Sequence, residues 1–423
     1  MRHAILGNGP AGVIAAETLR KHAPADDIVL VGDEPEPPYS RMAIPYLLMG
    51  EIGEEGTYLR KAPDHFARQR IELRTGRAVA VDSAARNVRL ADGAAIAFDR
   101  LLVATGSSPL RPPIPGMDLP GVHPCWTLDD ARRIAELAKP GARVLQMGAG
   151  FIGCIIMEAL AARGVQLTVV EMGEGMVPRM MGKAAGDMIR RWVESKGVRV
   201  HTSTRVEAIE PGKPLGVRLS NGEQVPADLV ISATGVRPNV AFLAGSGIEC
   251  AQGVLVDERM QSSVPAIHAA GDCAEAFDAT LGRRVVSAIQ PNAADQARCA
   301  GTNMAGGHAR LRGVTQINVL DSLGLVSTSF GQWQGVPGGE HAELTDEAGF
   351  RHIRLEFDGD VLVGSNAIGL TEHVGLMRGL IESRVRLGAW KEHLLRDPLR
   401  LPEAYLASAQ AQQAWGLQAG GRP

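Results

Sequence analysis

The sequence predicts an α/β protein with two parallel-sheet domains of the same kind, followed by a smaller α+β domain. Two observations carry this prediction. A unit of strand, glycine-rich turn, helix and second strand occurs at the N-terminus and again from Arg143. After Gly313 the pattern changes to several strands and one amphipathic helix. A chain of 423 residues has room for such a division, because one domain takes roughly 150 residues.

The first unit opens with an apolar strand at His3–Leu6 and closes with a second buried strand at Ile28–Val31. Between them an apolar helical pattern runs through Leu19. The turn before the helix has the spacing Gly-x-Gly-x-x-Gly, and its candidate binding residues are Gly7, Gly9, Pro10, Ala11 and Gly12. Two acids, Asp33 and Glu34, follow the second strand. This order is typical of a β–α–β unit that binds a ligand at the turn.

The second unit repeats the order. A strand at residues 143–147 leads into the same glycine spacing, whose candidate residues are Gly148, Gly150, Phe151, Ile152 and Gly153. A helix is predicted to run to Arg163, with Gly164 as its cap. The next strand, Leu167–Val170, ends at Glu171.

The glycine spacing alone is a weak signal in a chain with 50 glycines, so the surrounding strand, helix and acid must give it meaning. The first glycine permits the tight turn, the second lets the backbone approach a pyrophosphate, and the third allows close helix–strand packing. The helix N-terminus then faces the anion. We therefore predict two Rossmann-like dinucleotide-binding domains. The carboxylate of Glu171, with no cation offered by Met172 beside it, favours NAD over NADP.

The remaining segments are a linker, a third domain and a tail. The segment 109–120 holds five prolines and is predicted to be a linker. Strands are expected at 317–320, 325–330, 350–357 and 361–365. A helix is expected at 371–387, where apolar residues recur at spacings of three and four. The tail, residues 408–423, is rich in Gln, Ala and Gly and is expected to be frayed.

Composition excludes several classes of protein. The 44 Lys and Arg against 47 Asp and Glu give a net charge of −3, which argues against a nucleic-acid or polybasic membrane binder. Five widely spaced cysteines without a Cys-x-x-Cys pair indicate reduced thiols, and no His or Cys spacing supports a metal site. No apolar stretch approaches the ~20 residues that span a bilayer. We expect a soluble cytoplasmic protein with no membrane span, in which an oligomer is possible.

Further segments resemble motifs of flavoproteins with two dinucleotide-binding domains. The segment 101–109, with Ala104, Thr105 and Gly106, and the segment 229–239, with Thr234 and Gly235, resemble their paired A-T-G segments. Residues 269–272, which end in Gly271 and Asp272, are similar to their A-G-D motif. All occur in the order of the pyridine nucleotide–disulfide oxidoreductase superfamily (FAD/NAD-binding), which the chain resembles over about residues 1–310.

This resemblance implies an organisation and a set of binding residues. It implies an FAD-binding domain at 1–112 and 242–310, an inserted NAD-binding domain at 113–241, and a C-terminal α+β interface domain at 311–407. The FAD residues would be those of the first glycine turn together with Asp33, Glu34, Arg41, Ala104, Thr105, Gly106, Gly271, Asp272 and Asn292. The NAD residues would be those of the second turn together with Glu171, Thr234 and Gly235. Asp272 would bond the FAD ribityl chain, and a helix at Asn292–Met304 would direct its positive end at the flavin.

The residue that replaces the redox cysteine separates branches of the superfamily. Branches with one redox cysteine carry it in a stretch resembling C-G-L-P-Y, and here Met42 occupies that place. A thioether forms no thiolate or stable sulfenate, so thiol chemistry is not expected there. Residues 38–41 resemble the P-Y-x-R segment of rubredoxin, ferredoxin and nitrite reductase flavoprotein modules. The lysine that ferredoxin reductases place near the flavin is missing, with Tyr46 about there, which leaves Arg41 as the nearest cation candidate.

The second glycine turn departs from the superfamily pattern, because Ile155 stands where a glutamate is usual. Glu158, one helical turn further on, either substitutes for it or is an ordinary polar helix residue.

The function that the resemblance implies is transfer of hydride between NAD(H) and FAD, and of single electrons to or from an iron–sulfur protein (ferredoxin- or rubredoxin-like) or a partner subunit. The hydride chemistry belongs to the cofactors, so no side chain is predicted to be a catalytic acid, base or nucleophile. The alternatives are an NADH oxidase giving peroxide, and a flavoprotein subunit active only inside a complex such as a 2-oxoacid:acceptor oxidoreductase of the phenylglyoxylate dehydrogenase type. The stretch 378–400, with six basic residues against three acids, is a candidate docking face or simply a solvated one.

Overall fold

The computed structural model describes residues 1–408, and the chain within it forms two compact units. The first unit comprises Met1–Leu110, Trp126–Ala131 and Gly235–Val314. The second comprises Arg111–Cys125, Arg132–Thr234 and the chain from Thr315 onward. Of the predicted tail, only Ser408 lies among the described residues. The three-domain division and its boundaries stay a prediction.

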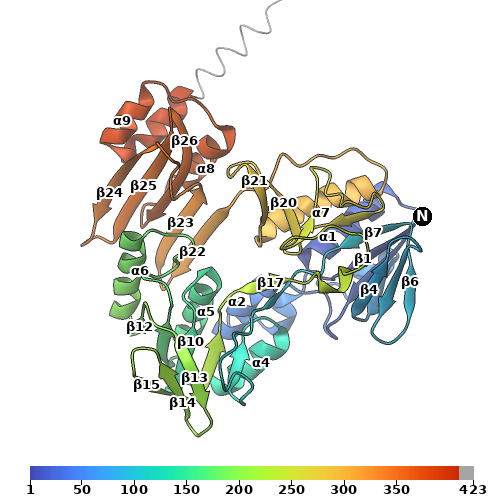
Figure 1. The fold of residues 1–423 in the computed structure, drawn as a ribbon, viewed down its shortest axis with the longest axis horizontal. Coiled ribbons are helices and arrows are strands. Elements are labelled where there is room, and N and C mark those ends of the chain that lie inside the picture. Colours follow the sequence, from blue (N-terminus) through green and yellow to red (C-terminus); the bar gives the residue numbers. More distant parts are fainter. Residues whose placement is uncertain (409–423) are drawn as a thin grey trace, which may run out of the picture. The chain divides into compact units, whose positions relative to one another are not determined.

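A five-stranded parallel sheet forms the centre of the first unit, with the strand order β19-β7-β1-β2-β3. Figure 1 labels β1 and β7 of this sheet. The strands are β1 (Arg2–Leu6), β2 (Asp27–Gly32), β3 (Ile71–Thr75), β7 (Arg100–Val103) and β19 (Ile267–Ala269). The helices α1 (Pro10–His22) and α7 (Gln290–Met304) pack closely on each other. Residues 3–6 of β1 and 28–32 of β2 are buried throughout, as expected for strands covered on both faces.

Smaller elements surround this sheet. One antiparallel sheet holds β4 (Ala78–Asp82), β5 (Asn87–Leu90) and β6 (Ala95–Ala97), and another group holds β18 (Val254–Leu255), β20 (Ala274–Asp278) and β21 (Arg283–Val286). The strands β8 (Ser107–Pro109) and β17 (Val236–Pro238) pair antiparallel. The short helices are η1 (Arg41–Ala43), α2 (Ile44–Met49), η2 (Glu54–Thr57), α3 (His65–Arg68) and η3 (Ala241–Leu243).

The second unit contains its own parallel sheet, with the order β12-β11-β10-β16-β9. The strands are β9 (Val122–Pro124), β10 (Arg143–Met147), β11 (Gln166–Val170), β12 (Arg199–His201) and β16 (Leu229–Ser232). Its helices are α5 (Phe151–Ala162) and α6 (Lys183–Ser195), and α4 (Leu128–Leu137) begins in the segment assigned to the first unit. An antiparallel sheet of β13 (Val206–Glu210), β14 (Leu215–Leu219) and β15 (Gln224–Ala227) completes this part.

A five-stranded antiparallel sheet follows in the second unit, in the order β22-β23-β26-β25-β24. The strands are β22 (Ile317–Ser322), β23 (Leu325–Gly331), β24 (Glu340–Asp346), β25 (Arg351–Asp358) and β26 (Val361–Ile368). Apolar residues of one face pack against α8 (Val374–Ser383), α9 (Trp390–Arg396) and η4 (Pro398–Arg400). Two corrections arise: β24 was not predicted, and the helix predicted at 371–387 is α8, which ends because Arg384 adopts a left-handed φ of 49°.

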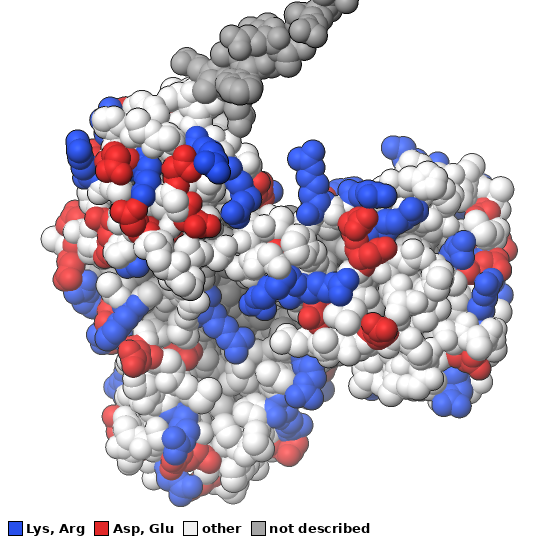
Figure 2. Space-filling model, turned by 45° about the horizontal axis from the view of Figure 1, so that its top comes forward, with Lys and Arg blue, Asp and Glu red and all other residues white. Residues whose placement is uncertain are grey.

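Charges of both signs are intermixed on the face drawn in Figure 2, in keeping with the net charge of −3. Within residues 1–408, no helix is both long and apolar enough to cross a membrane.

Candidate functional site

The first glycine turn has the geometry that its three glycines require. Gly7 has a φ of +109°, and a side chain there would collide with the carbonyl oxygen of Ala104. A side chain at Gly12 would collide with the carbonyl oxygen of Gly7, so α1 packs directly on the turn. Beside Gly9 there is open space, with no atom within 4 Å of the position that a Cβ would take. The turn is therefore tight where it must be and open at the one glycine where a ligand would approach.

The A-G-D turn lies against the start of both helices of the first unit. Gly271, at a φ of +81°, would place a Cβ 3.2 Å from that of Ala11 in α1 and 3.8 Å from that of Ala293 in α7. Its N–H donates to Oε1 of Gln296 at 2.7 Å. The N-terminal ends of α1 and α7 thus meet at one turn, and both carry the partial positive charge that favours an anion.

Gln296 is a site residue that sequence reasoning missed. Its side chain is fully buried, and its Nε2 has no hydrogen-bond partner among the described residues. The available signal was a glutamine in a helix face otherwise made of small residues, Ala293, Ala297 and Ala300. A buried polar group at such a position needs a partner, and Gly271 supplies one.

Asp272 is held in a largely buried position. Its Oδ2 accepts from the Oγ of Ser107 at 2.8 Å, and burial raises the pKa of this carboxyl. The A-T-G residues next to it are tied to residue 239: the Oγ1 of Thr105 donates to the carbonyl of Asn239 at 2.7 Å, and Nδ2 of Asn239 returns a bond to the carbonyl of Thr105 at 3.0 Å. Asn239 N–H also donates to the carbonyl of Gly106 at 2.9 Å. Ser107 and Asn239 support the site from positions that the motif match did not single out.

The two acids after β2 have different surroundings. Asp33 is exposed and makes no hydrogen bond or ion pair with any residue in the described part of the chain. Glu34 is engaged on both oxygens, at 2.6 Å by the hydroxyl of Tyr39 and at 2.6 Å by Nη2 of Arg41. Asp33 therefore has all its lone pairs available for a ligand's hydroxyl groups, whereas Glu34 is already held by two donors.

Arg41 is fixed rather than freely solvated. Besides Glu34, its guanidinium donates to the carbonyl of Trp126 at 3.0 Å and lies 5.8 Å from the ring of Tyr39 and 5.5 Å from that of Trp126. These contacts position the cation, and its placement near a flavin stays a prediction.

The helix predicted at Asn292–Met304 begins two residues earlier, at Gln290. The Oγ of Ser40 donates to Oε1 of Gln290 at 3.1 Å, and Nδ2 of Asn292 donates to the Oγ of Ser287 at 2.7 Å. The first turn of α7 is thus tied to the segment before it and to the segment that contains Arg41.

The second glycine turn repeats the geometry of the first. Gly148 has a φ of +98°, a side chain at Gly153 would collide with the carbonyl oxygen of Gly148, and the space beside Gly150 is open. Phe151 and Ile152 are half-buried in the first turn of α5. Fully buried Gln146 donates to the carbonyls of Gly148 and Gly153, both at 2.9 Å, and is a second supporting residue that the sequence did not reveal.

The carboxylate of Glu171 is hydrogen-bonded to the backbone of this turn. Its Oε2 accepts from the N–H of Ala149 at 2.7 Å, and its Oε1 accepts from the N–H of Gly173 at 2.7 Å. Met172 beside it is 73% exposed. The carboxylate expected to select NAD therefore also holds the turn in shape.

The other residues predicted for the NAD site or its helix make fewer contacts with the second glycine turn. The Oγ1 of Thr234 lies 3.4 Å from the Oγ of Ser232, and Ile155 and Glu158 are both half-buried in α5. Gly235, at a φ of +114°, belongs to the first unit, where its carbonyl accepts from Leu110 N–H at 2.8 Å.

The cysteines are poorly suited to redox chemistry. Burial raises the pKa of Cys154 to about 12, although it stands at a helix N-terminus, and raises the pKa of Cys273 and of Cys299 to about 11. Cys250 is exposed, and burial in part of its surroundings still raises its pKa. Met42 is half exposed, so the position of the thiol in related branches is open here but holds a thioether.

The basic stretch 378–400 is partly neutralised within the chain. Arg378 pairs with Glu382 at 2.9 Å, and Lys391 and Arg400 pair with Glu340 and Glu403. Three of its six basic side chains thus already form ion pairs within the chain.

The chain is similar to known proteins over most of its length. Residues 1–298 match the family described as pyridine nucleotide-disulphide oxidoreductase. The chain is 34% identical over 403 residues to the NADH-dependent phenylglyoxylate dehydrogenase subunit epsilon of Aromatoleum evansii, covering 94% of this chain and 95% of that one. It is 35% identical over 274 residues to the ferredoxin–NAD(+) reductase component of the biphenyl dioxygenase system of Paraburkholderia xenovorans, covering 64% and 67%. The structure of the covalent putidaredoxin reductase–putidaredoxin complex matches with a TM-score of 0.88 at 25% identity, covering 96% and 99%. The chain belongs to the pyridine nucleotide-disulphide oxidoreductase family.

Proposed function

We propose that this chain is an NADH:acceptor oxidoreductase that holds FAD on the first unit and NAD(H) on the second, and passes electrons to a protein partner. The observation that carries the proposal is the pair of glycine turns, each tight at its first and third glycine and open at its second. Use of FAD and NAD(H) and oxidoreductase activity follow from the family to which the chain belongs.

The residues of the first unit fit FAD. The open backbone at Gly9 and the N-terminal end of α1 would take the anionic pyrophosphate, because its free N–H groups favour negative charge. The N-terminal end of α7 would face the flavin ring. Asp33, with no partner in the described chain, would accept from the adenosine ribose hydroxyls, and the unbonded oxygen of Asp272 would accept from the ribityl chain. When bound, FAD supplies the hydride-accepting and one-electron chemistry, which no side chain here provides.

The residues of the second unit fit NAD(H). Open backbone at Gly150 and the N-terminus of α5 would face its pyrophosphate. Glu171 has lone pairs left after its two backbone bonds and would accept from the ribose that carries the adenine. The same negative charge, with exposed Met172 beside it, disfavours a 2′-phosphate.

A protein acceptor is supported by the relatives, one of which is named as a dehydrogenase subunit and another as a ferredoxin–NAD(+) reductase component. Buried thiols with raised pKa values support electron transfer without a redox cysteine. A cytoplasmic location is part of the proposal, supported by five widely spaced cysteines that form no disulfide.

The test is an anaerobic titration of the purified, flavin-loaded protein with NADH, followed by addition of an iron–sulfur acceptor. We expect FAD on release of the flavin, full bleaching at one NADH per flavin, and reoxidation by the acceptor. Flavin that NADH does not reduce would overturn the proposed activity. Reoxidation by oxygen alone, at a rate that accounts for steady-state turnover, would favour an NADH oxidase.

A further inference from the structure

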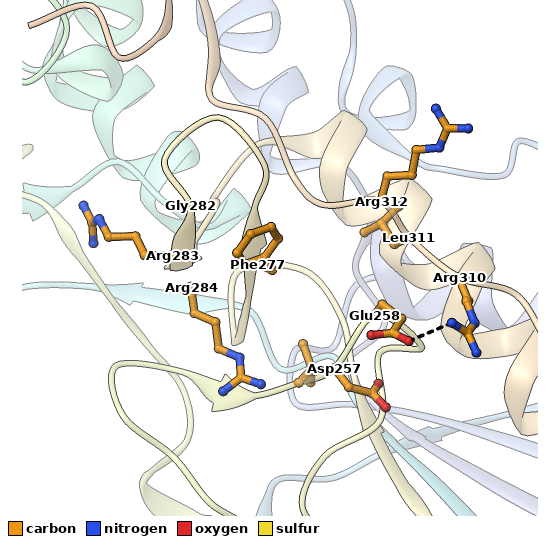
Figure 3. A pocket seen from close by; sticks show the side chains of 10 residues that line it. Asp257, Glu258, Phe277, Gly282, Arg283, Arg284, Arg310, Leu311 and Arg312 are labelled. Atoms are coloured by element: carbon orange, nitrogen blue, oxygen red, sulfur yellow. Dashed lines mark ion pairs between the residues drawn. The ribbon is translucent and has the colours of Figure 1, made fainter. Parts of the chain in front are cut away.

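A pocket of about 610 Å³ lies in the first unit and is not part of either glycine turn (Figure 3). Its walls come from the hairpin of β20 and β21, the segment 256–258 and the segment 310–312. Its charged lining comprises four arginines and two acids. We call it the arginine pocket, defined by Phe277, Arg283, Arg284, Arg310 and Arg312 together with those acids, Asp257 and Glu258.

Backbone hydrogen bonds fix these walls to one another. Val314 N–H donates to the carbonyl of Phe277 at 2.8 Å, and Leu311 N–H donates to the carbonyl of Glu258 at 2.7 Å. Fully buried Asp278 accepts on Oδ1 from the N–H and hydroxyl of Thr280 at the tip of the hairpin, at 2.8 and 2.6 Å. The pocket is therefore formed before any partner arrives, which lowers the ordering cost of binding.

Three of the four arginines of the pocket form no ion pair within the described chain. Arg310 pairs with Glu258 at 3.2 Å, as the dashed line in Figure 3 marks. Arg283, Arg284 and Arg312 are exposed and form no ion pair with any residue of the described chain. In a protein with a net charge of −3, such a local excess of cations is not a general property of the surface.

The lining of the pocket also includes an exposed aromatic ring. Phe277 is 48% exposed and stands directly opposite Arg284 in the register of the hairpin. Aromatic and arginine side chains are enriched at protein interfaces, where they combine apolar contact with charge-assisted hydrogen bonds. All four cations are arginines, whose planar group can bind a carboxylate through two N–H groups.

The arrangement of the arginines favours a protein over a small anion. Arg283 and Arg312 extend away from each other in Figure 3, so they do not converge on one phosphate group. Sites for small anionic ligands bury most of the ligand among convergent groups. Exposed guanidinium groups spread around an exposed aromatic ring instead match carboxylates distributed over a protein surface.

We infer that the arginine pocket is the docking surface for an acidic face of the electron-accepting protein partner; this inference rests on the proposed function. The hairpin gives the pocket a direct link to the proposed flavin site, because β20 begins two residues after Asp272. At ~3.3 Å per residue, Phe277 lies within about 17 Å of Asp272 along the chain. The stretch 378–400 is the weaker candidate, since half of its cations are already paired.

The test uses the flavin-loaded enzyme, an acidic [2Fe–2S] ferredoxin as the protein probe, and menadione as a small uncharged acceptor. Three variants are compared: Arg284→Glu, Phe277→Ala and the control Arg89→Glu. Arg89 is an exposed strand arginine of the same unit, with no ion pair in the described chain, so the control matches the charge change. Binding of the ferredoxin and kcat/KM for its reduction are measured at two ionic strengths.

We expect Arg284→Glu and Phe277→Ala each to weaken ferredoxin binding and kcat/KM tenfold or more, with a smaller salt dependence for Arg284→Glu. Menadione reduction should be unchanged in all variants, and Arg89→Glu should behave like the parent. No ferredoxin binding by the parent, or equal effects in Arg284→Glu and Arg89→Glu, would overturn the docking surface. Displacement of the ferredoxin by millimolar pyrophosphate at constant ionic strength would indicate a small-anion site and would also overturn it. Failure of the parent to reduce menadione would instead contradict the proposed function.

Discussion

Substitution of Glu171 tests two roles of one side chain: holding the second glycine turn and selecting the coenzyme. Its carboxylate accepts two backbone N–H groups, from Ala149 and Gly173, and is proposed to accept from the NAD ribose as well. In Glu171→Gln the side chain loses its charge, and one acceptor oxygen becomes an NH₂ donor that faces a backbone N–H. We therefore expect both coenzyme selection and the turn itself to weaken.

The size of each effect follows from the bonds removed. A hydrogen bond to a charged group contributes about 1.5–3 kcal/mol, which corresponds to about 10- to 140-fold in affinity. We expect kcat/KM for NADH to fall within this range. NADPH should lose less, because the repulsion of its 2′-phosphate is relieved, so the NADH:NADPH preference should narrow about tenfold or more. The free energy of unfolding should also fall by about 1–3 kcal/mol for the broken backbone bond.

Stopped-flow reduction of the flavin by each coenzyme measures the preference, and urea unfolding measures stability. The matched control is Glu174→Gln, which neutralises an exposed acid three residues away. An unchanged NADH:NADPH ratio in Glu171→Gln, or an equal change in Glu174→Gln, would refute the role of Glu171. Glu171→Arg removes both turn bonds at once, so it should lose NADH use before it gains NADPH use.

Three further predictions concern the first unit and the thiols. Burial raises the pKa of Asp272, so its charged form opposes folding, and Asp272→Asn should stabilise the apoprotein at pH 7 while weakening FAD binding. The difference in free energy of unfolding between variant and parent should shrink as the pH falls below the raised pKa toward the ordinary aspartate value. Urea unfolding at pH 7 and at this lower pH measures the difference. Gln296→Met leaves the Gly271 N–H unbonded, so the free energy of unfolding of the apoprotein, measured in urea, should fall by about 1–3 kcal/mol. An unchanged free energy of unfolding would contradict the importance of this bond. A thiol reagent at pH 8 should modify Cys250 first, and slowly because its pKa is raised, and the four buried cysteines only after unfolding. NADH-driven dye reduction should be retained; loss of activity on modification of the folded protein would restore a thiol mechanism.

The backbone of the site was predictable because glycine patterns encode backbone geometry directly. The positive φ at Gly7 and Gly148 and the close packing at Gly12 and Gly153 follow from the glycine spacing together with the strand before it and the helix after it. The family motifs located Asp272 for the same reason, since they mark fixed turns.

Side-chain partners were not predictable, because the sequence pattern does not record which side chains meet, whether they are near in sequence, like Arg41 and Glu34, or far apart. Gln296 is bonded to Gly271, and the guanidinium of Arg41 is bonded to Glu34 and the carbonyl of Trp126. Nothing in the sequence around Arg41 indicated that Glu34 already neutralises its charge.

Two secondary-structure errors have similar local causes. Strand β24 lies at the edge of its sheet and has one buried residue, Ala342, and one half-buried apolar residue, Leu344, so its hydrophobic pattern is too short to predict a strand. The apolar spacing that suggested a helix to residue 387 continues past Arg384, where the left-handed backbone ends α8. Periodicity records which residues are apolar and not where the backbone turns.

The two glycine turns are alike in backbone but differ in how their acids are held, and this difference suits the two cofactors proposed for them. Asp33 has no partner in the described chain, whereas Glu171 is held by two N–H groups and keeps lone pairs for a ligand. A carboxylate that is already fixed loses little freedom each time a ligand binds. That property matters at the NAD site, where the coenzyme must bind and leave in every turnover. At the proposed FAD site a cofactor that stays bound through turnover would order Asp33 only once.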